Sequence, residues 1–226
     1  TCNSEKILTV GAGKNVEEAR RIKIFSVRDV RIGILGLAER EFSIATAHSP
    51  GANPIDIIDY IRNTRNRRAD YDFLIVLLHG GAEHYPLPSP RLRDTCRSLV
   101  EQGASLVVCQ HSHCPGCYEE YKGSYIVYGQ GNLLFNEADQ IESWYQGFLI
   151  SLKIDESKTI LFSIIPFQQS NNGIGITQLP TQDEVQLLAM VHSRSRKLAE
   201  SGYVEREWTN YCRNMRYFYY SGIAGF

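Results

Sequence analysis

The chain has 226 residues, a formal net charge of −1 and 43% hydrophobic residues, which is typical of a folded protein with a sizeable core. This near-neutral balance gives no overall field that would favour binding of nucleic acid or anionic lipid. No apolar run approaches the ~20 residues that a membrane-spanning helix needs, and the first residues carry no signal-peptide pattern.

The first half of the chain predicts a hairpin and then a helix. Alternating apolar residues over 22–27 and a second apolar segment over 32–38 predict two paired strands. Asn53 followed by Pro54 predicts a helix start, because a capping residue precedes a proline at the first helical position. Three isoleucines are expected on the buried side of this helix: Ile57, Ile58 and Ile61.

Three further apolar runs each stop at a polar residue of the kind that binds ligands. The first run is continuous, a pattern typical of a strand buried on both faces of a sheet. A helix that begins at Ser89 separates the first two runs, so they form a βαβ unit with parallel strands. In open α/β sheets, ligands bind beyond the carboxyl ends of the strands. The runs are residues 73–78 before His79, 106–109 before Gln110-His-Ser-His113, and 125–128 before Gly129-Gln-Gly-Asn132.

This arrangement predicts a metal site. His111 and His113 are two residues apart, so in an extended segment both imidazoles point the same way. His79 supplies a third nitrogen from the neighbouring strand end, and Asn132 supplies a neutral oxygen. Glu83 is the one carboxylate nearby in the sequence, and we expect it, with Asn132, to orient other groups. His84 is expected at the surface.

The segment Cys114-Pro-Gly-Cys117 leaves three alternatives open. Its spacing is that of a redox pair, or of half a zinc site completed by His111 and His113. The third alternative is two unpaired thiols in a turn. The six cysteines of the chain do not reach the density of a disulfide framework.

The second half predicts a hairpin over 148–154 and 159–165, then a helix over 181–201 and a last helix. Residues at steps of three and four form an apolar stripe on the last helix, which we expect to pack on the body of the same protein. They are Trp208, Tyr211, Cys212, Met215, Phe218 and Tyr219.

Four short motifs follow one another within residues 7–136. They are His79-Gly-Gly-Ala-Glu83 with Pro86, His111-Ser-His113, Lys122-Gly123 with Tyr128, and Gly131-Asn132-Leu133. In this order the sequence resembles the capsule-synthesis protein CapA family of bacterial poly-γ-glutamate capsule biosynthesis, a branch of the calcineurin-like metallophosphoesterases. It departs from the family pattern at Gly80, where the family carries tryptophan.

The resemblance implies an α/β fold, a partial metallophosphoesterase-like layered sandwich over residues 1–168, with a helical tail over 169–226. It implies a metal-dependent, phosphoesterase-type hydrolase with His79, His111 and His113 as ligands, and Asn132 and Glu83 as catalytic or orienting groups. One or two ions of manganese, iron or zinc are implied. The superfamily's first ligand motifs, an Asp-x-His strand end among them, precede the segment matched here, so the chain resembles the back half of the domain.

The implied substrate is an anionic polymer or a phosphorylated compound, and the implied partners are the missing half or other capsule-synthesis proteins, associated with the cell envelope. No nucleic acid and no membrane segment of this chain is implied. The alternative is a non-catalytic scaffold or partner-binding subunit. It would hold at most one structural zinc, bound by His111, His113, Cys114 and Cys117.

Overall fold

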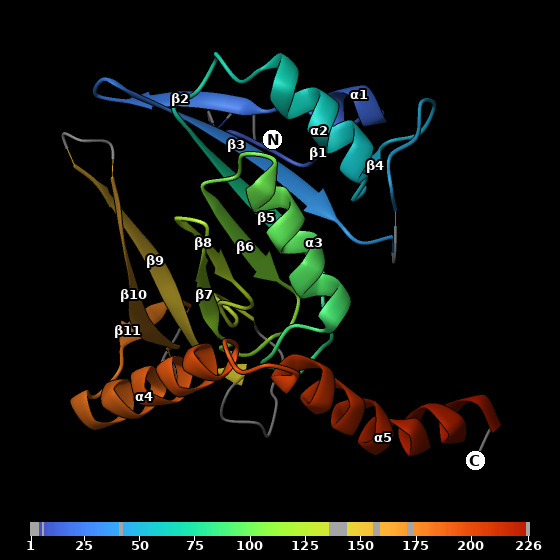
Figure 1. Cartoon of the computed structure of the whole chain (residues 1–226), viewed down its shortest axis with the longest axis vertical. Coiled ribbons are helices and arrows are strands. Elements are labelled where there is room, and N and C mark those ends of the chain that lie inside the picture. The colour runs from blue at the N-terminus through green and yellow to red at the C-terminus, as the bar shows by residue number, and fades with distance from the viewer. Residues whose placement is uncertain are drawn as a thin grey trace.

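The computed structural model describes residues 5, 7–40, 43–135, 144–155, 159–170 and 174–224, the last helix by its backbone alone at 218, 219 and 221–224. Cys2 lies outside this part. A six-stranded sheet runs through the molecule in the order β2-β3-β5-β6-β8-β7 (Figure 1). The four inner strands are parallel and both edge strands are antiparallel to their neighbours. The chain is thus an α/β protein, as the sequence predicts.

The strands of this sheet follow the predicted apolar segments. The predicted hairpin is confirmed by the antiparallel pair β2 and β3, and the predicted parallel strands by β5, β6 and β8. Their bounds are β2 Lys23–Val27, β3 Val30–Ala38, β5 Phe73–His79, β6 Leu106–Gln110, β7 Tyr118–Tyr121 and β8 Ser124–Val127. A short pair of strands packs against the four-residue helix α1 (Val16–Ala19). The two strands are β1 (Ala12–Gly13) and β4 (Gly51–Ala52).

Two helices, α2 (Ile57–Asn66) and α3 (Pro90–Glu101), cover one face of the sheet (Figure 1). Helix α3 begins as predicted, with the Ser89 side chain accepting from the amide of Leu92. Its apolar face packs against alternate residues of β5, which places Leu74, Val76 and Leu78 in the main core. The residues of α3 in this core are Leu92, Cys96, Leu99 and Val100.

The predicted start of α2 at Asn53 is wrong. Asp56 caps the helix, because its carboxylate accepts from the amides of Ile58 and Asp59. Asn53 is buried instead and donates a hydrogen bond to the carbonyl of Gly36 on β3. The predicted burial of Ile58 is also wrong, since its side chain is 63% exposed. Tyr60 and Thr64 are the buried residues of α2.

A second, three-stranded sheet lies against the other face, and it is built from β9 (Gln146–Ile154), β10 (Ile160–Gln169) and β11 (Ile176–Gln178) (Figure 1). The β9–β10 pair confirms the predicted second hairpin. It covers only part of that face, so Phe73, Ile75 and Leu77 of β5 are half-buried rather than fully buried as predicted. A cavity of about 330 Å³ remains between Phe73 and Ile75 and the hairpin.

Two helices end the chain. Helix α4 (Thr181–Lys197) packs Leu187 and Val191 into the core between the two sheets. Helix α5 (Tyr203–Ala224) contacts the body through its first turns and then extends away from it (Figure 1). None of the described helices is both long and apolar enough to cross a bilayer.

The predicted burial of the stripe on α5 is therefore wrong in part. Trp208 and Tyr211 are half-buried against Tyr85, and Cys212 is exposed. The side chains of Phe218 and Tyr219 lie outside the described residues. The division of the chain at residue 168 stays a prediction.

Candidate metal centre

The carboxyl ends of β5 and β6 place the candidate site. His79 ends β5 and is the register partner of Gln110, which ends β6. The loop after β8 joins them from the next strand position with Gly131 and Asn132. Together these segments enclose a cavity of about 190 Å³. Its lining residues are His79, Gln110, His111, Ser112, His113, Gln130, Gly131, Asn132 and Leu133.

The three predicted histidines lie close to one another at this edge. The ring centroids of His79 and His111 are 4.9 Å apart, and those of His111 and His113 are 5.9 Å apart. The structure therefore brings together imidazoles from two strand ends that are more than thirty residues apart in the sequence.

Among the described residues, Glu83, His111 and His113 form a compact group of metal-binding atoms. One ligand atom from each lies within 4.8 Å of the other two. Ligands that share one zinc ion each lie about 2.0–2.2 Å from it, so small side-chain rotations would close this group around a cation. Two imidazoles and one carboxylate are also a donor set that catalytic zinc sites use, with a further position left open. The residues fit a divalent cation.

This group differs from the predicted ligand set in one respect. Glu83, assigned an orienting role from the sequence, stands among the ligand atoms, whereas His79 contacts His111 and stays outside the compact group. Glu83 comes from the loop that follows β5. That loop is drawn toward the histidines because the amide of His84 donates to the carbonyl of Ser112.

The histidines of the site have an unusual backbone conformation. His84, His111 and His113 have φ angles of 56°, 112° and 54°, in the region that side chains other than glycine rarely adopt. Neighbouring contacts hold this conformation: Ser112 is 6% exposed, and its hydroxyl donates to the carbonyl of Cys114. Such outliers gather at binding sites, where the surrounding structure fixes them.

Asn132 lies beside His113. Its amide oxygen is 2.8 Å from Nδ1 of His113, and its side chain is buried. The side-chain oxygen of Asn132, which the sequence predicts as a metal ligand, is therefore hydrogen-bonded to His113.

Two aromatic residues at the site were not found from the sequence. The Trp144 ring stacks on His113 with centroids 4.9 Å apart, and Phe135 meets the same imidazole edge-on at 5.4 Å. His84 is exposed, as predicted, and its ring also stacks on Trp144. The indole nitrogen of Trp144 is buried and has no hydrogen-bond partner among the described residues. No local sequence pattern marks Trp144, because it lies just before the strand β9 and not within it.

Cys114 and Cys117 point into the protein interior. They are 5% and 0% exposed, and Cys117 belongs to the main core. Burial raises the pKa of both thiols above its ordinary value, which opposes the thiolate form that a redox pair requires. Within the described part of the chain, neither sulfur joins His111 and His113 in a compact ligand group.

A second cavity of about 440 Å³ adjoins the first, because His79 and Gln110 line both. Glu39, which follows β3, also lines it and accepts from the amide of Gly81. A β-carbon at Gly80 would lie 2.6 Å from Cγ of Glu39. The Glu39 side chain thus occupies the space beside position 80, where the family pattern has tryptophan.

The layered sheets and the histidines at the strand ends define an α/β protein of the metallophosphoesterase-like class. Comparison with protein families matches residues 1–137 to the bacterial capsule synthesis protein PGA_cap, and the chain belongs to this family.

Two curated relatives agree with this assignment. The chain is 27% identical over 166 residues to the capsule biosynthesis protein CapA of Bacillus anthracis. This alignment covers 70% of this chain and 39% of the relative. It is 30% identical over 132 residues to the PGA biosynthesis protein CapA of Bacillus subtilis (strain 168), which covers 57% of this chain and 34% of the relative. The matched region thus spans well under half of the length of either relative.

Proposed function

We propose that this chain carries part of the active site of a divalent-metal-dependent, phosphoesterase-type hydrolase in poly-γ-glutamate capsule synthesis. The observation that carries the proposal is the convergence of Glu83, His111 and His113 within 4.8 Å. Capsule synthesis is named for the family and for the Bacillus anthracis relative, and PGA biosynthesis is named for the Bacillus subtilis relative. Manganese, iron and zinc all remain candidates for the ion.

The charge of the site favours an anionic substrate. Neutral His111 and His113 with one carboxylate from Glu83 would leave a bound dication with about one net positive charge. That charge attracts phosphate groups or the carboxylates of a glutamate polymer. When bound, the ion supplies Lewis-acid polarisation of a phosphoryl or carbonyl oxygen.

The remaining residues would bind and orient the substrate. His79 and Gln110 lie between the 190 Å³ and 440 Å³ cavities, so a polymer crossing the strand ends would contact both. The buried indole N–H of Trp144 is a hydrogen-bond donor without a partner among the described residues, next to His113.

The donor set is too poor in carboxylates for a two-metal clamp. Two ions about 3.5–4 Å apart are usually balanced by several carboxylates, and the compact group contains only Glu83. We expect residues 1–226 to show at most trace phosphodiesterase activity. The longer relatives extend beyond the matched region, and a preceding segment with an Asp-x-His motif, supplied in cis or in trans, should raise that activity.

The test combines metal binding with turnover. Calorimetry should show one tight site for zinc or manganese in residues 1–226, abolished by His111→Ala. The exposed His48 offers a matched control, and His48→Ala should bind as the wild type does. Turnover of an aryl phosphodiester is then measured with and without the preceding segment of a relative. Absence of metal binding in the wild type would overturn the proposal.

A non-catalytic scaffold or partner-binding subunit is the second candidate function. The shortage of carboxylates favours it, because a single ion cannot stabilise both the attacking and the leaving oxygen of a phosphoryl transfer. In that case one ion binds, and the preceding segment restores no turnover.

A further inference from the structure

The side chains behind His113 form a continuous hydrogen-bonded chain that reaches the second sheet. It runs from His113 to Asn132, then to the carbonyl of Trp144, then to Gln169 at the end of β10. Asn132, Trp144 and Gln169 are each 7% exposed, so water does not compete with these bonds. We propose that this chain fixes His113 in the tautomer protonated at Nδ1, which directs Nε2 to the metal and makes Asn132 and Gln169 positioning residues.

The orientation of the Gln169 amide follows from the backbone. Its Oε1 lies 2.9 Å from the amide nitrogen of Phe135, which can only donate. Its Nε2 lies 3.0 Å from the carbonyl oxygen of Trp144, which can only accept. The reverse orientation would place two donors together at one end and two acceptors together at the other.

The same carbonyl orients Asn132. The Nδ2 of Asn132 donates to the Trp144 oxygen at 3.2 Å, so Oδ1 faces His113. An amide oxygen only accepts, and the 2.8 Å contact with Nδ1 of His113 is therefore a hydrogen bond that the imidazole donates. A neutral imidazole carries one proton, so the lone pair lies on Nε2.

Ring packing holds the imidazole in this position. Trp144 stacks on His113 at an interplanar angle of 25°, and Phe135 contacts it edge-on at 73°. Trp144 thus contributes its carbonyl to Asn132 and its ring to His113. A histidine ligand whose other nitrogen donates to a neighbour has a fixed orientation and a more basic donor atom.

The assignment of roles rests on the proposed metal binding, whereas the tautomer itself does not. Asn132 acts through His113 and is not a ligand, because its amide oxygen accepts a hydrogen bond from the Nδ1–H group of His113. Gln169 touches neither the histidines nor Glu83 in any described hydrogen bond, and it acts through the Trp144 carbonyl and the Phe135 amide.

The first experiment reads the tautomer directly in the metal-free chain. Long-range ¹⁵N–¹H correlation spectra of residues 1–226 are recorded at pH 8, above the ordinary imidazole pKa of about 6.5. His113, assigned by its loss in His113→Gln, should be protonated at Nδ1. Protonation at Nε2 would overturn the proposal, whether or not the protein binds metal.

The second experiment separates positioning from general stability. Asn132→Asp keeps an acceptor for the Nδ1 proton and should retain the Nδ1–H tautomer, whereas Asn132→Leu should give a mixture of tautomers. Loss of such outer partners weakens metal binding by about 10- to 100-fold, and we expect a loss in this range for Asn132→Leu and near its lower end for Gln169→Met.

Gln168 provides the matched control, since it neighbours Gln169 on β10 but its side chain points to the opposite face of the sheet. Gln168→Met should bind zinc as the wild type does. Equal zinc affinity and an unchanged tautomer in folded Asn132→Leu and Gln169→Met would overturn the proposal. Protonation at Nδ1 without any zinc binding supports the tautomer and contradicts the proposed function instead.

Discussion

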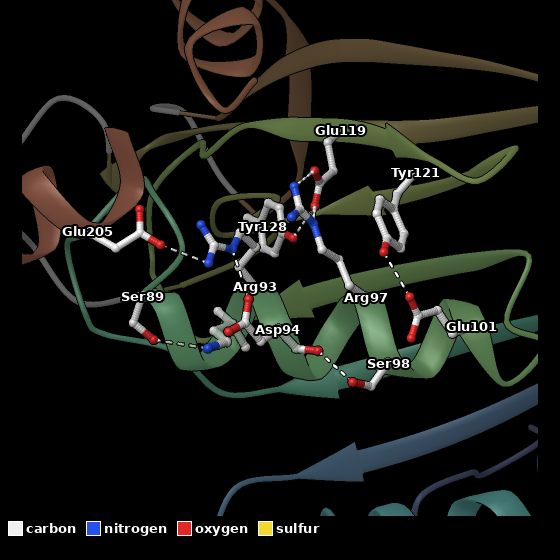
Figure 2. Close-up of polar contacts among 11 residues, drawn as sticks. Ser89, Arg93, Asp94, Arg97, Ser98, Glu101, Glu119, Tyr121, Tyr128 and Glu205 are labelled. Atoms are coloured by element: carbon white, nitrogen blue, oxygen red, sulfur yellow. Dashed lines mark hydrogen bonds and ion pairs between the residues drawn. The ribbon is translucent and has the colours of Figure 1, made fainter. Parts of the chain in front are cut away.

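Arg97 on α3 makes two hydrogen bonds to Glu119 on β7, one from Nε at 3.1 Å and one from Nη2 at 2.7 Å (Figure 2). The Glu119 carboxylate also accepts from the hydroxyl of Tyr128. These bonds connect α3, β7 and Tyr128, which follows β8, so they brace the end of the loop that leads from His111 and His113 into β7. Bidentate pairing of this kind favours a single geometry.

Replacing Glu119 should therefore destabilise the protein. Glu119→Gln leaves Arg97 without its charged partner in a mostly buried position, since the Glu119 side chain is only 10% exposed. We expect a loss of about 1–3 kcal/mol in the free energy of unfolding, measured by urea denaturation at pH 7. Glu101→Gln, at an exposed ion pair with Lys122, is the control and should leave the urea midpoint unchanged. Equal midpoints for both variants would contradict the bracing role.

His79 and His111 should differ in their effect on metal binding. His111 belongs to the compact group with Glu83 and His113, whereas His79 contacts the His111 ring from outside that group. We expect His111→Ala and Glu83→Gln to abolish binding, and His79→Ala to weaken it by about tenfold, as loss of an outer partner does. Calorimetric titration with zinc distinguishes them. A greater loss in His79→Ala than in Glu83→Gln would restore the ligand set predicted from the sequence.

Cys117 should contribute to stability and not to metal binding. Its thiol is fully buried in the main core, where it acts as a small apolar group. Cys117→Ala should lower the free energy of unfolding by about 1–2 kcal/mol through the space it leaves, with zinc stoichiometry unchanged. Loss of one tightly bound zinc in Cys117→Ala or Cys114→Ala would instead support the structural zinc site.

The attachment of α5 should depend on acidity. Hydrogen bonds from its own backbone amide and from Arg93 lower the pKa of Glu205 below its ordinary value of 4.5. Because the folded-state pKa is depressed, the ionised carboxylate stabilises the fold fully above pH 4.5, and this contribution is lost as the pH falls through the lower folded value. Figure 2 shows this pair, which lies 2.9 Å apart.

The urea midpoints of wild type and Glu205→Gln should accordingly differ at pH 7 and converge at about pH 3. Glu200→Gln, at an exposed residue between α4 and α5, is the control and should follow the wild type at both values. A difference that persists at low pH would show that Glu205 acts through packing rather than charge.

The sequence predicted the strands and their ends because those signals are local. Apolar runs that stop at His79, Gln110 and Asn132 identify three strand ends, and parallel pairing brings them to one edge of the sheet. The helix of residues 90–101 was predictable for the same reason, from its cap and its apolar spacing.

What the sequence could not provide depends on contacts between distant segments. Glu83 reaches the histidines because a backbone hydrogen bond joins its loop to Ser112. Gln169, at the end of β10, reaches the carbonyl of Trp144, which lies 25 residues earlier in the chain. Asn53 and Asp56 are both of a residue type that caps helices. Asn53 is buried and bonded to β3, so Asp56 caps α2 instead.

The positive φ angles of the site histidines have a consequence for how this protein balances stability against binding. At φ values of 112° and 54°, His111 and His113 occupy conformations in which glycine would be free of the clash that a β-carbon causes. Replacing His111 with glycine should therefore give a protein that resists urea better than His111→Ala, although both variants lack the imidazole. A loop selected for stability alone would favour glycine at these positions, so the proposed metal binding would be obtained at the expense of a less stable fold.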